Sequence, residues 1–268
     1  MFLDNKEKKI SEEYINNGFV IRPVADQAVL DWIQSCFEEQ SKKILKVVSE
    51  KKTSSWLNFI HDHVPVNQLN NFRLKMIEFM NANSEFRKKY YQLARPYLES
   101  LVGNELAMQR RINLSIQMPD DDSSLLTVHA DTWSGDSPYE VVVWLPLVDC
   151  YKTKAMYLLP PLADKKLKED FIQFSSSSSE ELFRRIEKEV IWIEIKAGEV
   201  LIFNQNLPHG NRINHETETR WSMNCRFKGI FTPYGDKKIG EFFEPITLKA
   251  ASRTGMTYRF PQLPSKNN

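Results

Sequence analysis

TRWSMNCRF, residues 219–227, alternates polar and apolar side chains, and this stretch decides the fold. Successive side chains of a β-strand point to opposite faces, so the spacing predicts a strand with two unlike faces. The apolar face carries Trp221, Met223, Cys225 and Phe227, and the polar face carries Arg220, Ser222, Asn224 and Arg226. A polar face inside a barrel suits a charged ligand, because a guanidinium binds a carboxylate bidentately. The alternative is the solvent-facing side of an edge strand.

The hydrophobic period changes near residue 105. Before it, helical spacing predicts helices over 11–17, 27–50 and 67–102, the last with a break at 81–84, and a short strand at 19–23. After it, alternation predicts further strands at 111–118, 125–131, 139–147, 156–159, 191–195 and 199–203, and the alternating stretch above extends to 231. Short strands at this spacing indicate an antiparallel sandwich or barrel.

Composition supports one globular domain without an overall basic field. The 268 residues carry a formal net charge of +1, which disfavours a general nucleic-acid coat. We expect a single domain, 1–268, with mainly helical support over 1–104 and a β-barrel core over 105–231. That core carries an insert at 161–189, either a mobile flap or a solvated spacer, and 232–268 is a C-terminal extension. No long apolar run is present and the N-terminus is charged, so we expect a cytoplasmic protein without a membrane span.

His129-Ala130-Asp131 is the most informative motif, because residues i and i+2 of a strand share a face. An imidazole and a carboxylate then converge on one point. His209, in Leu207-Pro208-His209-Gly210, follows another predicted strand and supplies a third ligand. Two histidines and one carboxylate on one side of an octahedral ion leave three adjacent positions open, as non-haem iron oxygenases require.

Other polar residues have two possible roles each. The predicted inward-facing positions Asn113, Ser115 and Gln117 contact a ligand or form a buried hydrogen-bond network. Trp133 and Tyr139 follow the His-x-Asp motif, where they stack on a substrate or pack the loop. His61-Asp62-His63 lacks an obvious third ligand, and the Asp120-Asp121-Asp122 run is more typical of a solvated turn.

Taken together, these motifs resemble those of the Fe(II)/2-oxoglutarate-dependent dioxygenases, in particular the phytanoyl-CoA-hydroxylase-like branch. The matching motifs are His129-x-Asp131, Gly198-Glu-Val-Leu-Ile-Phe203, His209-Gly210, Asn214 and Arg220-x-Ser222. More narrowly, the sequence is similar to oxygenases of bacterial carbohydrate-biosynthesis clusters. The resemblance implies an α+β fold with a mainly β core, a double-stranded β-helix of the jelly-roll or cupin-like kind with the helical N-terminal region packed on it.

The resemblance also implies roles for individual residues. His129, Asp131 and His209 would bind Fe(II), and Arg220 with Ser222 would hold the distal carboxylate of 2-oxoglutarate. Dioxygen is the second cosubstrate, and oxidative decarboxylation to succinate would drive hydroxylation of a C–H bond. Further expected contacts are Gln117 and Asn224 for the cosubstrate, and Trp133, Tyr139, Asn113 and Arg226 for the substrate.

The expected substrate is a small polar metabolite, in particular a sugar or a carbohydrate-biosynthesis intermediate. No nucleic-acid or membrane partner is expected, and the sequence leaves the oligomeric state open. Two alternatives stay open: a protein or nucleic-acid hydroxylase of the same chemistry, and a non-catalytic sugar-binding β-barrel. Desaturation or epoxidation in place of hydroxylation also stays open.

Overall fold

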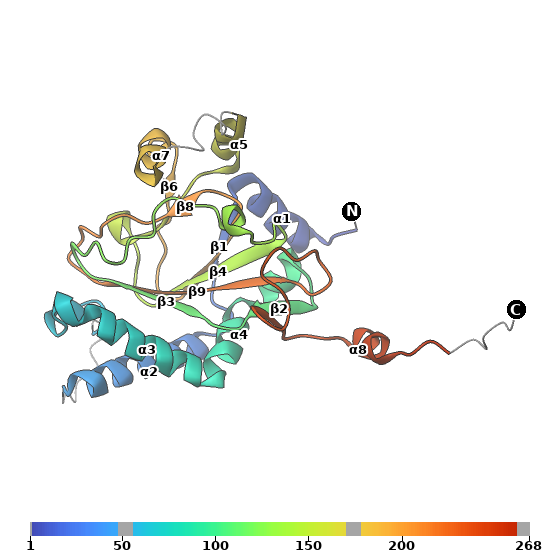
Figure 1. The fold of residues 1–268 in the computed structure, drawn as a ribbon, viewed down its shortest axis with the longest axis horizontal. Helices are drawn as coiled ribbons and strands as arrows, with labels where there is room; N and C mark the ends of the chain where they lie inside the picture. Colours follow the sequence, from blue (N-terminus) through green and yellow to red (C-terminus); the bar gives the residue numbers. More distant parts are fainter. Residues whose placement is uncertain (1, 48–55, 170–177, 262–268) are drawn as a thin grey trace, which may run out of the picture.

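The computed structural model describes residues 2–47, 56–169 and 178–261. Two antiparallel sheets, one large and one three-stranded, lie one above the other (Figure 1). Helices cover the outer face of the large sheet, and the small sheet lies across its inner face. The fold is thus mixed α and β with an antiparallel β core, as the sequence predicts.

The large sheet is built around its longest strand, β9 (Arg220–Gly229). The strand order is β1 (Phe19–Pro23), β7 (Glu199–Phe203), β4 (Glu140–Pro146), β9, β2 (Leu106–Gln109) and β10 (Phe243–Pro245). β3 (Asn113–Gln117) pairs with the first half of β9, and β2 pairs with its end. Because β4 lies along the other side, β9 is hydrogen-bonded on both edges and is held rigidly.

The two faces of β9 differ as predicted. Trp221, Met223, Cys225 and Phe227 are buried in the main hydrophobic core. Trp221 contacts Phe37, which belongs to one of the helices that cover this face of the sheet, with ring centroids 5.9 Å apart. Tyr90 Oη donates to the Val143 carbonyl at 2.7 Å, which fixes another helix to β4. Burial of large apolar side chains, at about 1.5–3 kcal/mol each, therefore holds the helical layer against the sheet.

Three helices form that layer: α2 (Gln27–Leu45), α3 (Leu69–Ala82) and α4 (Ser84–Leu101). The predicted break at 81–84 is confirmed, because Asn83 ends α3 and its side chain accepts from the Glu85 amide at 3.0 Å to cap α4. α4 continues through Pro96. The described part of the second predicted helix ends at Leu45, and residues 48–50 of that prediction lie outside the described residues.

The first helix, α1 (Asn5–Asn17), begins earlier than the predicted start at Ser11. The Asp4 side chain accepts hydrogen bonds from the Lys6 and Glu7 amides, and the Glu7 carboxylate accepts one from the Asp4 amide. This capping box starts the helix in a charged segment that has no apolar period to reveal it. The helix ends at Gly18, whose φ of 81° lies in the left-handed region that favours glycine.

The small sheet consists of β6 (Ile191–Trp192), β5 (Tyr157–Leu158) and β8 (His209–Gly210). β6 and β5 are shorter than the strands predicted at 191–195 and 156–159. The insert contributes α5 (Pro161–Glu169) and α7 (Ser179–Ile186), and Phe183 of α7 packs on Tyr157 with ring centroids 5.0 Å apart. Most of the serine run, and with it the question of a mobile flap, falls on 170–177, outside the described residues.

The predicted strand over 125–131 is wrong. Only His129 forms a β-bridge there, and the Leu126 amide donates to the Asn211 side chain at 2.6 Å instead of to a neighbouring strand. The short strands β2, β8 and β10 were not predicted, since two to four residues give too little alternation. The described residues also include the 3-10 helices η1 (Ile60–Asp62), η2 (Val66–Gln68), η3 (Asp131–Ser134) and η4 (Lys152–Lys154).

The C-terminal extension carries α8 (Ala250–Thr257), which has no buried residue and stands away from the sheets (Figure 1). In the part of the chain that the structure describes, no helix is both long and apolar enough to cross a membrane.

Candidate active site

His129 and His209 meet as direct partners across an isolated β-bridge. Their backbones exchange two hydrogen bonds, of 3.0 Å and 2.8 Å, and their ring centroids lie 4.3 Å apart. Glycine at position 210 lets the backbone at Leu126 come close to β8, because a Cβ at Gly210 would lie 2.7 Å from the Leu126 carbonyl oxygen. The loop before β4 is thereby held against β8, and the two imidazoles face one point.

Both imidazoles are oriented by backbone carbonyls. His129 Nδ1 lies 2.7 Å from the Thr127 carbonyl, and His209 Nδ1 lies 2.9 Å from the Leu207 carbonyl. A carbonyl oxygen only accepts, so Nδ1 carries the proton and Nε2 keeps its lone pair in the neutral ring. Burial, reinforced by repulsion from His129, lowers the pKa of His209 to about 4. His209 is therefore neutral at physiological pH, the form that binds a metal.

Asp131 completes the group from the start of η3. Its Oδ1 lies 3.5 Å from His129 Nε2, and its amide donates to the Gln205 carbonyl at 3.0 Å. Ligand atoms of His129, Asp131 and His209 all lie within 4.8 Å of one another. Although the predicted strand is absent, Ala130 keeps an extended backbone, so the convergence expected from the His-x-Asp spacing is present.

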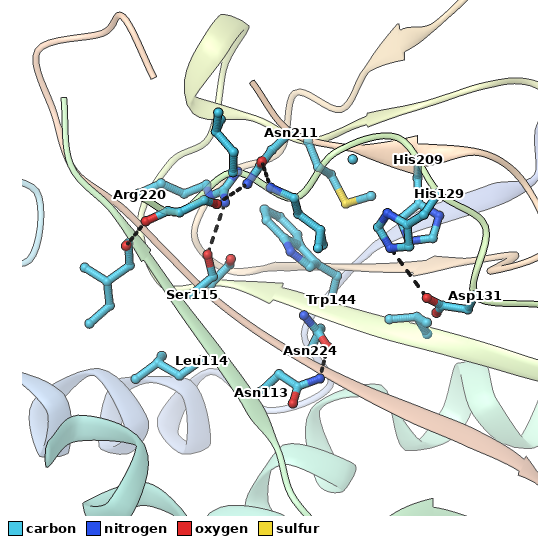
Figure 2. Close-up of a pocket in the computed structure, with 18 of the residues that line it drawn as sticks. Asn113, Leu114, Ser115, His129, Asp131, Trp144, His209, Asn211, Arg220 and Asn224 are labelled. Carbon is cyan, nitrogen blue, oxygen red and sulfur yellow. Dashed lines mark hydrogen bonds and ion pairs between the residues drawn. The ribbon is translucent and has the colours of Figure 1, made fainter. Parts of the chain in front are cut away.

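The three residues line a cavity of about 520 Å³ between the two sheets (Figure 2). Its large-sheet wall includes Val142, Trp144, Ser222 and Asn224, and its small-sheet wall includes Gly210. In Figure 2 the Trp144 indole lies between the histidines and Arg220. The His129–Asp131–His209 group and Arg220 therefore share one cavity and occupy different ends of it.

Arg220 is 3% exposed and has no carboxylate partner among the described residues. Its Nη2 donates to Ser115 Oγ at 3.1 Å, and its Nη1 lies 3.5 Å from the Ala155 carbonyl oxygen. Arg220 Nε and Ser222 Oγ are buried without a hydrogen-bond partner. Burial lowers the pKa of Arg220 to about 10, so the group stays charged at neutral pH. A buried cation and an unpaired hydroxyl facing one cavity form a site for an anion.

Arg226 lies on the same face of β9 but is already paired. Its Nη2 and Nε lie 2.9 Å and 3.1 Å from Asp131 Oδ2. The sequence predicts Arg226 as a substrate contact, and Arg226 does line the cavity. Its guanidinium also pairs with the carboxylate of Asp131, a pairing that spacing along the chain could not reveal.

The remaining predicted residues lie in different places. Asn113 and Asn224 line the cavity and are joined by an amide hydrogen bond of 2.9 Å (Figure 2). Gln117 is fully buried, donates to the Arg212 carbonyl at 2.7 Å and does not line the cavity. Trp133 and Tyr139 are 42% and 55% exposed and also lie outside the cavity lining.

The mouth of the cavity was not recognised in the sequence. Arg73 and Asn70 of α3 line it together with Leu125 and Leu126, two exposed leucines. Arg73 forms an ion pair of 2.7 Å with Asp121 and also donates to the Ile116 carbonyl, so its charge is already neutralised. Because α3 precedes the strands that line the cavity and carries no motif, only the packing of the helical layer reveals this contribution.

Neither of the two other candidate motifs, His61-Asp62-His63 and Asp120-Asp121-Asp122, forms a metal-binding cluster. His61 Nδ1 lies 2.8 Å from Thr219 Oγ1, and His63 stacks on Trp56. Asp121 pairs with Arg73, while Asp120 contacts His215 at 2.8 Å. Among the described residues, His129, Asp131 and His209 are the one group found with a metal-binding arrangement.

Comparison with known proteins finds similarity in structure only. No family model and no curated protein sequence matches the chain. Among solved structures, the non-heme monooxygenase ThoJ in a nickel complex is 13% identical, with a TM-score of 0.58 over 96% of this chain and 89% of ThoJ. SnoK, a non-heme alpha ketoglutarate dependent carbocyclase from nogalamycin biosynthesis, is 14% identical, with a TM-score of 0.57 over 92% and 97%.

HygX from Streptomyces hygroscopicus, with nickel and 2-oxoglutarate bound, is 14% identical, with a TM-score of 0.50 over 88% of this chain and 90% of HygX. These likenesses show that the chain shares its fold with ThoJ, SnoK and HygX. Neighbours of this fold are crystallised with iron or nickel and with 2-oxoglutarate, and this chain has a His-Asp-His group that could bind such a metal.

Proposed function

We propose that the chain is an Fe(II)- and 2-oxoglutarate-dependent oxygenase with a double-stranded β-helix core. One observation carries the proposal. A His-Asp-His group and a buried arginine that has no carboxylate partner in the described part of the chain line the same cavity. The fold shared with ThoJ, SnoK and HygX supports it.

The residues fit the metal and the cosubstrate. Nitrogen and carboxylate donors suit Fe(II), and three protein ligands leave adjacent positions for other groups. At the other end, the unpartnered Arg220 Nε and Ser222 Oγ match the acceptor oxygens of a distal carboxylate. Trp144, between the two ends, would flank the carbon chain of 2-oxoglutarate.

Each side chain has a separate task in this proposal. When bound, iron would supply the oxidation of a substrate C–H bond, coupled to decarboxylation of 2-oxoglutarate and consumption of dioxygen. His129, Asp131 and His209 hold the metal, and their backbone contacts keep both Nε2 atoms aimed at it. Arg220 neutralises and orients the cosubstrate. The surrounding apolar side chains Val142, Met156 and Phe203 limit water around the reacting groups.

We propose a small, polar and uncharged substrate, with a sugar or a carbohydrate-biosynthesis intermediate as the leading class. The paired amides of Asn113 and Asn224 offer hydrogen bonds to hydroxyl groups, and Leu125 and Leu126 offer apolar contact. Two of the cations that could bind the phosphates of a nucleotide-linked substrate are already paired. Arg73 pairs with Asp121, and Arg212 pairs with Glu180 at 2.6 Å. Membership of the phytanoyl-CoA-hydroxylase-like branch is part of this proposal and rests on the sequence motifs.

Succinate formation tests the proposed activity. The purified chain is incubated with Fe(II), 2-oxoglutarate and dioxygen, and with a panel of free sugars, nucleotide sugars, acyl thioesters and amino acids. We expect succinate release that one neutral sugar-like compound stimulates and that His129→Ala removes. Stimulation by acyl thioesters alone would contradict the substrate class. Metal binding without any succinate would favour the non-catalytic sugar-binding barrel.

A further inference from the structure

We propose that Arg226 fixes Asp131 as a metal ligand through one oxygen only, an inference that rests on the proposed metal site. Arg226 is a positioning residue in this account, because it would act through Asp131 and not on the substrate. The evidence is the way in which its guanidinium approaches the carboxylate.

Two donors of Arg226 converge on the same oxygen of Asp131. Nη2 lies 2.9 Å from Oδ2 and Nε lies 3.1 Å from it. Nε donates a hydrogen bond to Oδ2 and Nη2 adds an ion-pair contact to the same oxygen, so Oδ2 is directed at the guanidinium. The other oxygen, Oδ1, lies 3.5 Å from His129 Nε2 and faces the metal position. Binding of a metal by both oxygens would therefore require Arg226 to withdraw.

Buried neighbours prevent that withdrawal. Gln205 Oε1 lies 3.1 Å from Arg226 Nε, and Gln109 Oε1 accepts from the Arg226 amide at 3.2 Å. Asp136 Oδ1 lies 3.5 Å from Nε, and Lys237 holds the other oxygen of Asp136 at 2.5 Å. The guanidinium is thus fixed between Asp131 and Asp136.

Gln205 provides a second connection between Arg226 and Asp131. Its backbone carbonyl accepts from the Asp131 amide at 3.0 Å, and its side-chain amide donates to Glu140 Oε2 at 3.0 Å. The side chain of Asp131 is therefore held by Arg226, and its backbone is held by Gln205, which itself contacts Arg226. A single-oxygen ligand leaves the coordination positions needed for a two-oxygen cosubstrate and dioxygen.

The positioning role and a purely electrostatic role predict opposite signs. A guanidinium beside a dication repels it, so electrostatics alone would make metal binding tighter once Arg226 is removed. Loss of an outer partner that orients a ligand typically weakens metal binding 10–100-fold. The direction of the change in metal affinity therefore decides between the two roles.

Anaerobic titration with Co(II), followed by its ligand-field absorption, measures this directly without turnover. We expect Arg226→Met to weaken binding about 10–100-fold. Arg226→Lys keeps the charge but loses the planar two-donor geometry, so we expect binding at least about fivefold weaker than in the wild type. Arg110→Met removes an exposed cation that contacts the Gly240 carbonyl and should leave the affinity unchanged.

Circular dichroism checks that each variant is folded, and if Arg226→Met does not fold, the lysine variant decides. Wild-type affinity or tighter binding in either folded variant would overturn the positioning role while leaving the metal site intact. Failure of the wild type to bind Co(II), or binding that His209→Ala does not reduce, would instead overturn the proposed function on which this inference rests.

Discussion

The two ends of the inner face of β9 carry the same side chain in opposite surroundings. Arg226 lies between two carboxylates, at 2.9 Å from Asp131 and 3.5 Å from Asp136. Arg220 is buried and has no carboxylate partner among the described residues. One arginine completes a network within the protein, and the other leaves a positive charge for something outside the protein to neutralise.

This difference indicates which end of the cavity is complete in the folded chain. At the metal end, backbone carbonyls and Arg226 already satisfy the atoms that do not face the metal. At the Arg220 end, Nε of Arg220 and Oγ of Ser222 remain unpaired. Leaving buried polar groups unpaired costs about 1–3 kcal/mol each, a cost that an anionic ligand removes.

Breaking the metal end should have the largest effect. Asp131→Ala removes a ligand and leaves Arg226 facing a void, so we expect no detectable 2-oxoglutarate turnover and a loss of Co(II) affinity of at least about 100-fold. Asp120→Ala, an exposed carboxylate that contacts His215, is the matched control and should behave as the wild type. Normal turnover in Asp131→Ala would mean that the metal lies elsewhere.

Removing each arginine separately should change the stability of the metal-free protein in opposite ways. Arg226→Met leaves Asp131 and Asp136 buried with one partner fewer, and we expect the free energy of unfolding to fall by about 3 kcal/mol. Arg220→Met removes a buried cation that has no counter-ion, so the free energy of unfolding should stay within about 1 kcal/mol of the wild type or rise. Urea unfolding measures both. Equal losses in the two variants would contradict the difference between the two ends.

Ser222 provides a smaller test at the Arg220 end. Its unpaired hydroxyl should donate to the distal carboxylate, and a hydrogen bond to a charged group contributes about 1.5–3 kcal/mol. We expect Ser222→Ala to weaken 2-oxoglutarate binding about tenfold, measured by calorimetry with Co(II) present. Asn224→Ala, on the same strand face but nearer the metal ligands, should change that affinity less. A larger effect of Asn224→Ala would move the cosubstrate along the cavity.

Local patterns in the sequence were sufficient to predict the faces of β9, the break at Asn83 and the convergence of His129, Asp131 and His209. Each depends on spacing along a short segment: alternation, a capping residue or a His-x-Asp pair. The strand expected over 125–131 fails because its amides bond to scattered partners, a side chain, a turn carbonyl, a single bridge and the Gln205 carbonyl, and not to one neighbouring strand. Alternation cannot distinguish such an extended loop from a strand.

Long-range pairing accounts for the remaining differences. Arg220 and Arg226 are equivalent in the alternation of 219–227, and only the folded loop that carries Asp131 and Asp136 distinguishes them. Gln117 also has the predicted position in the strand alternation. Its side-chain amide nevertheless donates to the Arg212 carbonyl, and Gln117 does not line the cavity. The mouth residue Arg73 is contributed by a helix with no motif of its own.

The most direct test of the central claim is an anaerobic titration of the protein with Fe(II) and 2-oxoglutarate, followed by visible absorption. The account predicts a charge-transfer band that saturates at one 2-oxoglutarate per chain, and Arg220→Ala should need about 100-fold more 2-oxoglutarate to reach it. Absence of the band in the wild type, or an unchanged 2-oxoglutarate requirement in Arg220→Ala, would contradict the account.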